Sequence, residues 1–272
     1  MSALSVPFSH PVDPAQRERI QAALTQIEAQ HDVVVPFACE SGSRGWGFAS
    51  PDSDYDVRFI YVHRLPWYLT VHPGRDVIEL PIDDVLDVSG WDLRKALGLL
   101  QVSNPTLLEW LRSPIVYRQD AAALAALNDL AHKHFSPVRA WHHYASMARK
   151  TFREHLLGEH VRYKKYLYSL RPLLAARWIV QHGSAPPMVF ADLVPATLDW
   201  QQDRALLNAI RALLDVKMRA GEAATSPRWP GLHAFIEAEL AQHTPPESGA
   251  HAVTGSGQDL DDFLCATVLR QA

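Results

Sequence analysis

The sequence predicts an α+β protein, in which a small mixed sheet with helices is followed by an all-helical C-terminal part. Up to Pro114, short β-rich runs alternate with turn signals, whereas beyond it nearly every segment carries apolar residues at helical spacing. The 272 residues are 47% hydrophobic, which is enough for one large core or two modest ones. We therefore expect a sheet-containing domain over residues 1–114, a helical domain over 115–243, and a flexible linker with a short terminal helix over 244–272.

The N-terminal part begins with an amphipathic helix. Asp13 can cap this helix, Pro14 suits its first position, and apolar residues recur on one face as far as Ile27. Residues 33–39 then form a short apolar run that predicts a strand, and Pro36 within it suits a strand start or an edge strand. The first strand leads at once into a glycine-rich turn.

Further short strands are expected before the pattern becomes helical. The β-rich runs lie at residues 55–62, 77–80 and 85–88. From Trp91 onward the apolar residues recur at helical spacing, with a helix restart at Asn104 and Pro105. These strands are expected to form one mixed sheet.

The second half is expected to be all-helical. Helices are predicted at residues 121–134, 138–157, 159–181, 204–220 and 232–242. Pro172 lies inside the third of these and should kink or break it. Residues 244–258 are rich in Pro, Gly and Ser, which predicts a mobile linker.

Composition limits the partners and the compartment. The net charge of −4 means that any contact with nucleic acid needs a local basic patch. Cys39 and Cys265 match neither a zinc spacing nor a disulfide framework, so a reducing compartment, the cytoplasm, is expected. No basic stretch followed by an apolar run predicts a secretory signal, and no segment is apolar over a length that would span a membrane.

The residues that could carry chemistry lie in one short stretch. A strand enters Gly42 and Ser43, a turn follows, and Asp54 and Asp56 open the next strand. Residues two apart in a strand point to the same face, so the two carboxylates lie side by side and repel each other. A divalent cation such as Mg²⁺, which prefers hard oxygen ligands, makes such a pair tolerable. The alternative reading, a solvated acidic turn, is weakened because both features occur together.

Gly42 and Ser43 suit the phosphate end of the substrate. A glycine lets backbone N–H groups approach phosphate oxygens, a serine adds a hydroxyl donor, and Arg44 adds charge. The stretch matches neither a P-loop nor a dinucleotide-binding fingerprint. A phosphate cradle facing two metal-binding carboxylates predicts nucleotidyl transfer from a nucleoside triphosphate.

A third carboxylate is expected if two metal ions are bound. Asp87 and Glu79 are the candidates, because each is an acidic residue between apolar ones in a predicted strand. Asp87 is favoured because it directly precedes the turn signal Ser89-Gly90 and so lies near the end of its strand. Glu79 stays open as the alternative.

The stretch from Glu40 to Arg58, ESGSRGWGFASPDSDYDVR, closely resembles predicted nucleotidyltransferases associated with RNA ligases and RNA repair, within the polymerase-β-like superfamily. Later segments resemble the same family, and the likeness extends over most of the chain up to the linker; these segments are SGWDLRK at 89–95, NPTLLEWL at 104–111 and YKKYL at 163–167. The resemblance implies a polymerase-β-like nucleotidyltransferase domain. It also implies that Gly42 and Ser43 contact the triphosphate and that Asp54 and Asp56 bind Mg²⁺ or Mn²⁺.

A basic stripe in the helical half is a second candidate for nucleotide binding. Lys164, Tyr168 and Arg171 fall at i, i+4 and i+7 of a predicted helix, with Lys165 close by. Such a stripe could grip phosphates and close over a nucleotide in a cleft between the two domains. A solvated basic face with a packed Tyr explains the pattern equally well.

The sequence therefore predicts a metal-dependent enzyme that moves a nucleoside monophosphate from an NTP to an acceptor hydroxyl and releases pyrophosphate. The resemblance favours an RNA end as the acceptor, while a protein side chain or a small molecule would use the same chemistry. A different class, a non-catalytic nucleotide- or RNA-binding regulatory module, is the main rival. The retained pair Asp54 and Asp56 argues against it, because a binding module has no need of repelling carboxylates.

Overall fold

The computed structural model describes residues 12–83, 85–220, 225–242, 244–247 and 253–271. The chain divides into two compact units that interleave along the sequence. The sheet unit contains the described residues of 11–45, 54–135 and 253–272, and the helical unit contains those of 46–53 and 136–252. Each unit is described by itself below.

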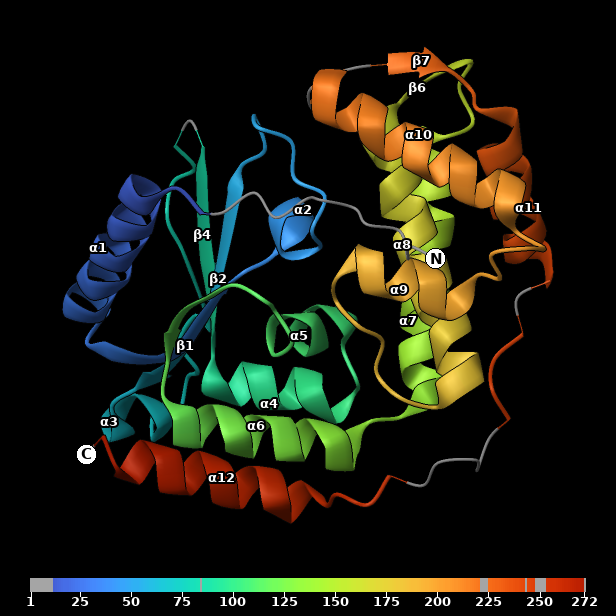
Figure 1. Ribbon diagram of the computed structural model, residues 1–272. Coiled ribbons are helices and arrows are strands. Elements are labelled where there is room, and N and C mark those ends of the chain that lie inside the picture. The colour runs from blue at the N-terminus through green and yellow to red at the C-terminus, as the bar shows by residue number, and fades with distance from the viewer. Residues whose placement is uncertain (1–11, 84, 221–224, 243, 248–252, 272) are drawn as a thin grey trace. The chain divides into compact units, whose positions relative to one another are not determined.

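The sheet unit is built on five strands in the order β3-β4-β2-β1-β5. β2 and β4 pair in parallel, and the other neighbours pair antiparallel, so the sheet is mixed as predicted. The strands are β1 (Val33–Glu40), β2 (Tyr55–His63), β3 (Val77–Glu79), β4 (Leu86–Asp92) and β5 (Val116–Gln119). Together with the helices that cover it, this sheet confirms the α+β class (Figure 1).

Helices cover both faces of this sheet. On one face, α1 (Pro14–His31) packs Ile20, Leu24 and Ile27 against buried residues of β1 and β2. The opposite face carries a second apolar cluster, to which α4 (Leu93–Gln101), α5 (Pro105–Trp110), α6 (Ala121–His134) and α12 (Gly257–Leu269) all contribute. Two short helical segments, α2 (Gly42–Gly45) and α3 (Leu65–Tyr68), complete the unit. The sheet is therefore the middle layer of its unit.

The position of Pro36 corrects one expectation. Pro36 lies neither at a strand start nor on an edge strand, because β1 has β2 on one side and β5 on the other. The β1–β2 register shifts between Val34 and Phe37, so a bulge accommodates the proline that has no N–H to donate. The carbonyl of Pro36 still accepts from the N–H of Asp120 at 2.7 Å. β5 itself was not predicted from the sequence.

β4 is longer than predicted and changes the reason for choosing Asp87. The strand continues through Ser89 and Gly90 to Asp92, so Asp87 lies near its beginning and no turn follows it. Gly90 is needed inside the strand because a Cβ there would lie 2.2 Å from Cε2 of Phe59 on β2. Asp92, predicted to be helical, instead ends the strand and caps α4 by accepting from the N–H of Arg94.

The helical unit is formed mainly by α7 (Pro137–His155) and α8 (Tyr163–His182). It also contains α9 (Phe190–Thr197), α10 (Arg204–Ala220), α11 (Pro230–Gln242) and a small antiparallel pair, β6 (His160–Arg162) and β7 (Thr225–Pro227). Four of the five predicted helices correspond closely to α6, α7, α10 and α11. The segment predicted as one helix over 159–181 begins instead with β6, and α9 was not predicted.

Pro172 does not break α8. The helix continues from Tyr163 to His182, and every residue from Ser169 to Ala176 is buried. Packing around this stretch holds the helix although the proline removes one of its hydrogen bonds. Tertiary burial thus overrides the local signal of the proline.

The two units do not follow the predicted division at residue 114. β5 and α6 lie after that point in the chain but belong to the sheet unit, since β5 pairs with β1. α12, expected after a flexible linker, also belongs to the sheet unit. Part of the predicted linker at 244–258 lies outside the described residues.

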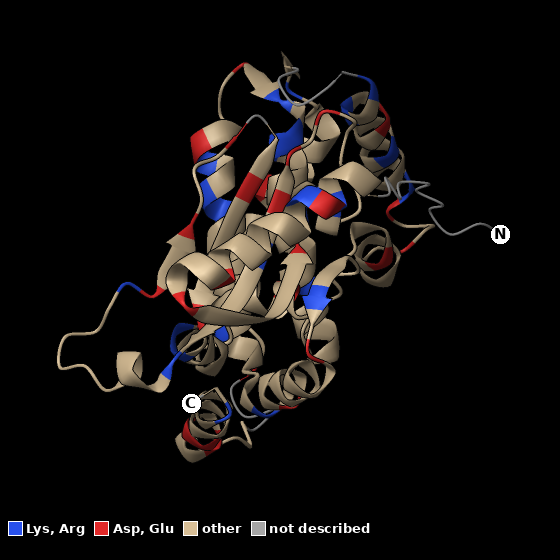
Figure 2. Cartoon of the chain, turned by 90° about the vertical axis from the view of Figure 1, so that its left-hand side faces the viewer, with Lys and Arg blue, Asp and Glu red and all other residues tan. Residues whose placement is uncertain are grey.

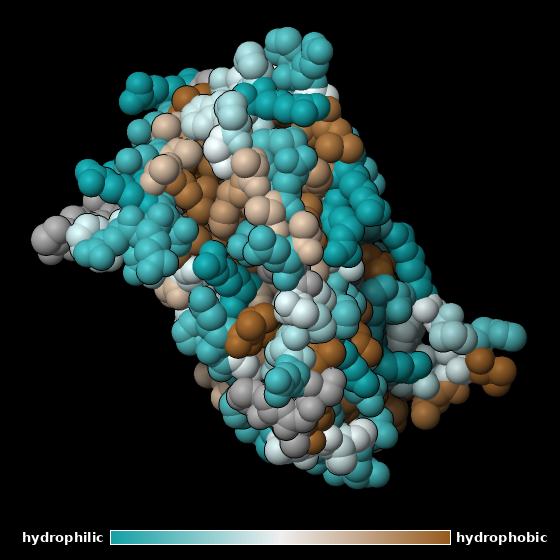
Figure 3. Space-filling model, turned by 90° about the vertical axis from the view of Figure 1, so that its right-hand side faces the viewer, coloured by the Kyte–Doolittle hydropathy of each residue, from teal (hydrophilic) through white to brown (hydrophobic). Residues whose placement is uncertain are grey.

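Polar and apolar residues intermix on the surface drawn in Figure 3. Within the described ranges, no helix combines the length and the apolar character needed to cross a bilayer.

Candidate active site

The turn between β1 and β2 brings the glycine of the motif against a carboxylate. β1 ends at Glu40, α2 begins at Gly42, and the N–H of Ser41 donates to the carbonyl of Asp56 at 2.8 Å. Gly42 has a φ of +56°, and a Cβ on it would lie only 1.9 Å from Oδ2 of Asp56. Glycine is therefore required twice, by the left-handed backbone and by the close approach of the carboxylate.

Asp56 and Asp87 lie next to each other on neighbouring parallel strands. They are direct register partners on β2 and β4, so both side chains point to the same face of the sheet. Arg58 lies between them, with Nη2 3.1 Å from Oδ1 of Asp56 and 2.7 Å from Oδ2 of Asp87. Nη1 of Arg58 also donates to the carbonyls of Val57 and Asp87. Figure 2 shows acidic positions on adjacent strands of this sheet.

Asp54 and Glu79 differ from this pair in their surroundings. Asp54 is exposed just before β2, two residues from Asp56. Glu79 ends β3, opposite Ser89 of β4, and forms an ion pair with Arg75 at a side-chain exposure of 54%. The structure thus brings Asp87, rather than Glu79, directly beside Asp56.

Glu40 is a buried carboxylate that the sequence reasoning did not single out. Its side chain is fully buried, Oε1 accepts from the N–H of Asp56 at 2.8 Å, and Oε2 accepts from the hydroxyl of Tyr117. Burial raises the pKa of this carboxyl to about 7, against the lowering effect of the Tyr117 hydrogen bond. Its place at the end of an apolar strand, directly before Ser-Gly-Ser, is the sequence signal that could have identified it. Glu40 thus fixes the backbone of Asp56.

Ser43 and Arg44 are both nearly buried in α2. Arg44 is 7% exposed, and its guanidinium lies 4.0 Å from the ring centroid of Tyr55. This cation–π contact holds the guanidinium close to the start of β2. Arg44 therefore places a positive charge beside Gly42, and burial and the ring contact restrict the motion of its side chain.

The middle of the motif, residues 46–53, belongs to the helical unit. The carbonyl of Trp46 accepts from the N–H of Phe190, and the buried Lys217 on α10 donates to the hydroxyls of Ser50 and Ser53, at 3.3 and 3.5 Å. Sequence reasoning missed Lys217, because nothing in its local pattern distinguishes it from a surface lysine. Residues 46–53 are thus held in place by contacts inside the helical unit.

The predicted stripe on α8 does not form one surface. Arg171 is 1% exposed; its Nε and Nη2 donate to the carbonyl of Met188, and its guanidinium lies 4.8 Å from the ring centroid of Trp46. Tyr168 contacts the same Trp46 ring edge-on, with centroids 5.4 Å apart. Lys164 is half-buried. Arg171 and Tyr168 therefore hold the 46–53 segment, and the prediction that the stripe as a whole grips phosphates is corrected for Arg171.

The donor atoms of the sheet unit suit a divalent cation. Asp56 and Asp87 offer hard carboxylate oxygens on one face, and the absence of a side chain on Gly42 lets Oδ2 of Asp56 pack against the turn after β1. Among the described residues, no three acidic, histidine or cysteine side chains converge as a complete metal site. The pair therefore fits the hard-oxygen chemistry of Mg²⁺ or Mn²⁺, with water and substrate oxygens supplying the other ligands.

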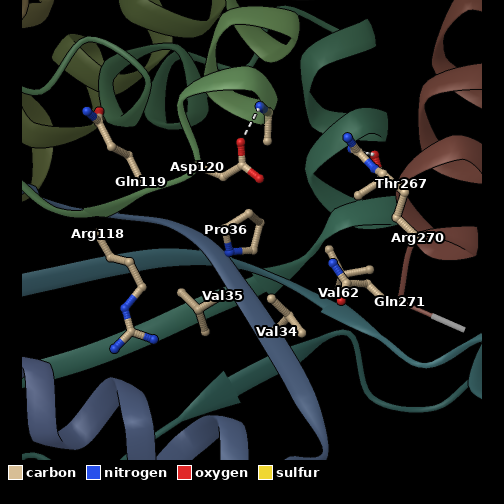
Figure 4. A pocket seen from close by; sticks show the side chains of 11 residues that line it. Val34, Val35, Pro36, Val62, Arg118, Gln119, Asp120, Thr267, Arg270 and Gln271 are labelled. Atoms are coloured by element: carbon tan, nitrogen blue, oxygen red, sulfur yellow. Dashed lines mark hydrogen bonds between the residues drawn. The ribbon is translucent and has the colours of Figure 1, made fainter.

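A pocket of about 320 Å³ at the other end of β1 and β2 does not serve this chemistry (Figure 4). It is lined by residues that include Pro36, Arg118 and Asp120. Asp120 caps α6 by accepting from two backbone N–H groups, and Arg118 pairs with Glu28 at 2.7 Å. The charged groups along this pocket are already engaged in holding the fold.

Comparison with known proteins identifies the class. Residues 16–266 match the family model described as "RlaP: RNA repair pathway DNA polymerase beta family". The chain belongs to this family, a nucleotidyltransferase-like family of the polymerase-β type.

A curated relative and a solved structure are similar to the chain. YcgL of Bacillus subtilis (strain 168), described as an uncharacterized protein, is 45% identical over 224 residues, which cover 82% of this chain and 85% of that protein. The crystal structure of a nucleotidyltransferase-like protein from Exiguobacterium sibiricum 255-15 matches with a TM-score of 0.31 at 12% identity, covering 94% of this chain and 77% of that one.

Proposed function

We propose that the protein is a metal-dependent nucleotidyltransferase, which moves a nucleoside monophosphate from an NTP to an acceptor hydroxyl and releases pyrophosphate. The observation that carries this proposal is the placement of Asp56 beside Asp87, with the side-chain-free Gly42 against the carboxylate of Asp56. Two neighbouring carboxylates repel each other, and Arg58 between them offsets that repulsion.

In this proposal, the turn after β1 receives the phosphates. The left-handed Gly42 lets the backbone approach a phosphate oxygen, the Ser43 hydroxyl adds a donor, and Arg44 adds a fixed positive charge. Developing negative charge on the departing pyrophosphate would be stabilised at this turn. Lys164 and Tyr168 are proposed as further nucleotide contacts, whereas Arg171 acts by holding Met188 and Trp46.

Asp54, Asp56 and Asp87 would hold Mg²⁺ or Mn²⁺. When bound, such an ion would supply positive charge to the α-phosphate and to the acceptor hydroxyl. The chain's own contribution is to fix the carboxylates: the pairing of β2 with β4 sets the distance between Asp56 and Asp87, and Glu40 holds the N–H of Asp56. Asp54 is exposed just before β2 and would join the pair from the strand's start.

We propose an RNA end as the acceptor, because the matching family is described as part of an RNA repair pathway. A protein side chain or a small molecule would need the same carboxylates and phosphate turn. A non-catalytic nucleotide- or RNA-binding module is the alternative of a different class. The neighbouring carboxylates favour the enzyme, because binding alone is weakened by placing negative charge beside a phosphate.

The test is incubation with each α-³²P-labelled NTP, Mg²⁺ or Mn²⁺, and separate pools of RNA and protein acceptors. We expect label to reach an acceptor with the intact chain but not with Asp56→Ala, whose far-ultraviolet circular dichroism should match that of the intact chain. Asp262→Ala, an exposed acidic residue on α12, is the matched control and should retain full transfer. Undiminished transfer by Asp56→Ala would refute the assignment, and metal-independent binding without transfer would favour the binding module.

A further inference from the structure

The helical unit contains a pocket of about 530 Å³ that the proposed chemistry does not use. It is lined by the end of α7, the turn that follows, β6, the first turn of α8 and the start of β7. We name it the α7–β6 pocket, and its lining residues are Arg153, Glu154, His155, Leu157, Gly158, His160, Val161, Arg162, Lys165 and Thr225.

Positive charge predominates in the α7–β6 pocket. Three basic side chains, those of Arg153, Arg162 and Lys165, line the pocket with one carboxylate, that of Glu154. Within the described part of the chain, no ion pair joins these three cations to a carboxylate, and Glu154 lies 3.9 Å from the imidazole of His155. The excess is local, because the whole chain carries a net charge of −4.

Burial and the neighbouring charges both affect two titratable groups in this pocket. The pKa of Lys165 is lowered by burial and then by the adjacent charges of Lys164 and Arg162. The pKa of His155 is lowered by burial and then by Lys165, with Arg162 and Lys150 adding to the effect. Cations that depress one another's protonation in this way gain free energy when an anion joins them.

The backbone around the pocket is held in place rather than loose. The guanidinium of Arg228 donates to the carbonyls of Gly158, at 2.7 Å, and of Leu157. β6 pairs with β7, which buries Val161 and leaves His160 and Arg162 exposed on the same side. α8 also begins here without a side-chain cap and without an acidic residue in its first turn, so its positive end adds to the field.

We propose that the α7–β6 pocket binds the backbone phosphates of a nucleic-acid strand. Its cations come from three successive elements rather than from one point, which suits a chain of phosphates better than a single anion. This proposal deepens the function proposed above. It rests on that function only in assigning the bound nucleic-acid strand the role of acceptor. Binding at the pocket can be measured without any turnover.

The test is fluorescence anisotropy with a labelled single-stranded RNA of about 20 nucleotides, long enough to cover a surface of this kind. We expect Arg162→Ala/Lys165→Ala to bind this RNA on the order of tenfold more weakly than the intact chain. The slope of log affinity against log salt should also fall by about 1.4, since two phosphate contacts are lost. ATP binding and the unfolding midpoint should not change.

The matched control is Arg204→Ala/Arg211→Ala, which removes two exposed cations from α10, outside the pocket. Equal RNA affinity and salt slope for the two double variants would overturn the proposal. Weaker ATP binding with unchanged RNA binding would overturn it too, because the pocket would then hold a nucleotide. If RNA binding depends on Arg162 and Lys165 but the intact chain transfers no label, the pocket stands and the proposed reaction fails.

Discussion

At the scale of single residues, the candidate site depends on a glycine as much as on its carboxylates. Gly42 is the clearest case, because its backbone is left-handed and its Cα lies against the carboxylate of Asp56. Glu40 is the complementary case, a fully buried acid that holds the N–H of the same Asp56. One residue of the motif thus makes room for the carboxylate, and another fixes its backbone.

Gly42→Ala should reduce nucleotidyl transfer on the order of a hundredfold, because the added Cβ must displace the Asp56 carboxylate. The left-handed backbone adds a strain of about 1 to 2 kcal/mol. Steady-state transfer and thermal unfolding would measure the two effects. Gly98→Ala on α4 is the matched control, since its Cβ meets nothing within 4 Å, and it should leave transfer unchanged.

Asp87→Asn should lower kcat on the order of a hundredfold, because Asp87 lies directly beside Asp56. Glu79→Gln should change kcat by less than about threefold, since Glu79 is an exposed partner of Arg75. Transfer kinetics of both variants at saturating NTP would decide between the two acids. A larger loss for Glu79→Gln would reverse the assignment of the third carboxylate.

At the scale of elements, the contact between the end of β2 and the short helix α3 depends on the protonation state of His63. The imidazole of His63 stacks on Trp67 with centroids 4.1 Å apart, and the backbone N–H of His63 donates to the hydroxyl of Tyr68. Burial, together with the nearby charge of His31, lowers the pKa of His63 from 6.5 to about 4. The neutral imidazole therefore belongs to the folded state.

The stability of the sheet unit should fall as the pH is lowered from 6.5 through 4. In that window the unfolded chain binds a proton at His63 that the folded chain does not, and the loss should reach about 1 to 2 kcal/mol after allowance for partial exposure. His63→Phe should remove this part of the pH dependence. Denaturant unfolding at several pH values would measure the difference, and an NMR titration that gives His63 an ordinary pKa would contradict the prediction.

At the scale of the whole molecule, the chain closes the sheet unit with its last helix. α12 brings Leu260 and Val268 into the same apolar cluster as residues of β2, α4 and α6. The N–H groups of Thr254 and Gly255 both donate to the carbonyl of Lys133, which anchors the approach to this helix. The short helix predicted to follow a flexible linker is thus part of the core of the sheet unit.

Removal of residues 253–272 should lower the free energy of unfolding of the sheet unit by at least about 3 kcal/mol, because it uncovers apolar side chains of α4 and α6. Leu260→Ala should cause a smaller loss in the same direction. Cys265→Ser, at an exposed position of the same helix, should have little effect. Equal stability of the truncated and full chains by denaturant unfolding would contradict this account.

Prediction from sequence succeeded where the signal is local. The helices with caps and regular apolar spacing were found, including the restart at Asn104 and Pro105. β5 and α9 were missed because short segments show too little periodicity to be told from loops. The choice of Asp87 was made for a reason that the structure removes, since no turn follows it in β4.

Local sequence sets the strand, turn and strand that place Gly42 and Asp56 in one motif, because backbone preferences and the two-residue period of a strand act over a few residues. The parallel pairing of β2 with β4, which puts Asp87 beside Asp56, arises only when the whole sheet assembles. The assembled fold also turns Arg171 inward and places Arg153, Arg162 and Lys165 along one pocket. The physical reason is that pairing of distant strands and burial of helix faces depend on the whole core, which no local stretch encodes.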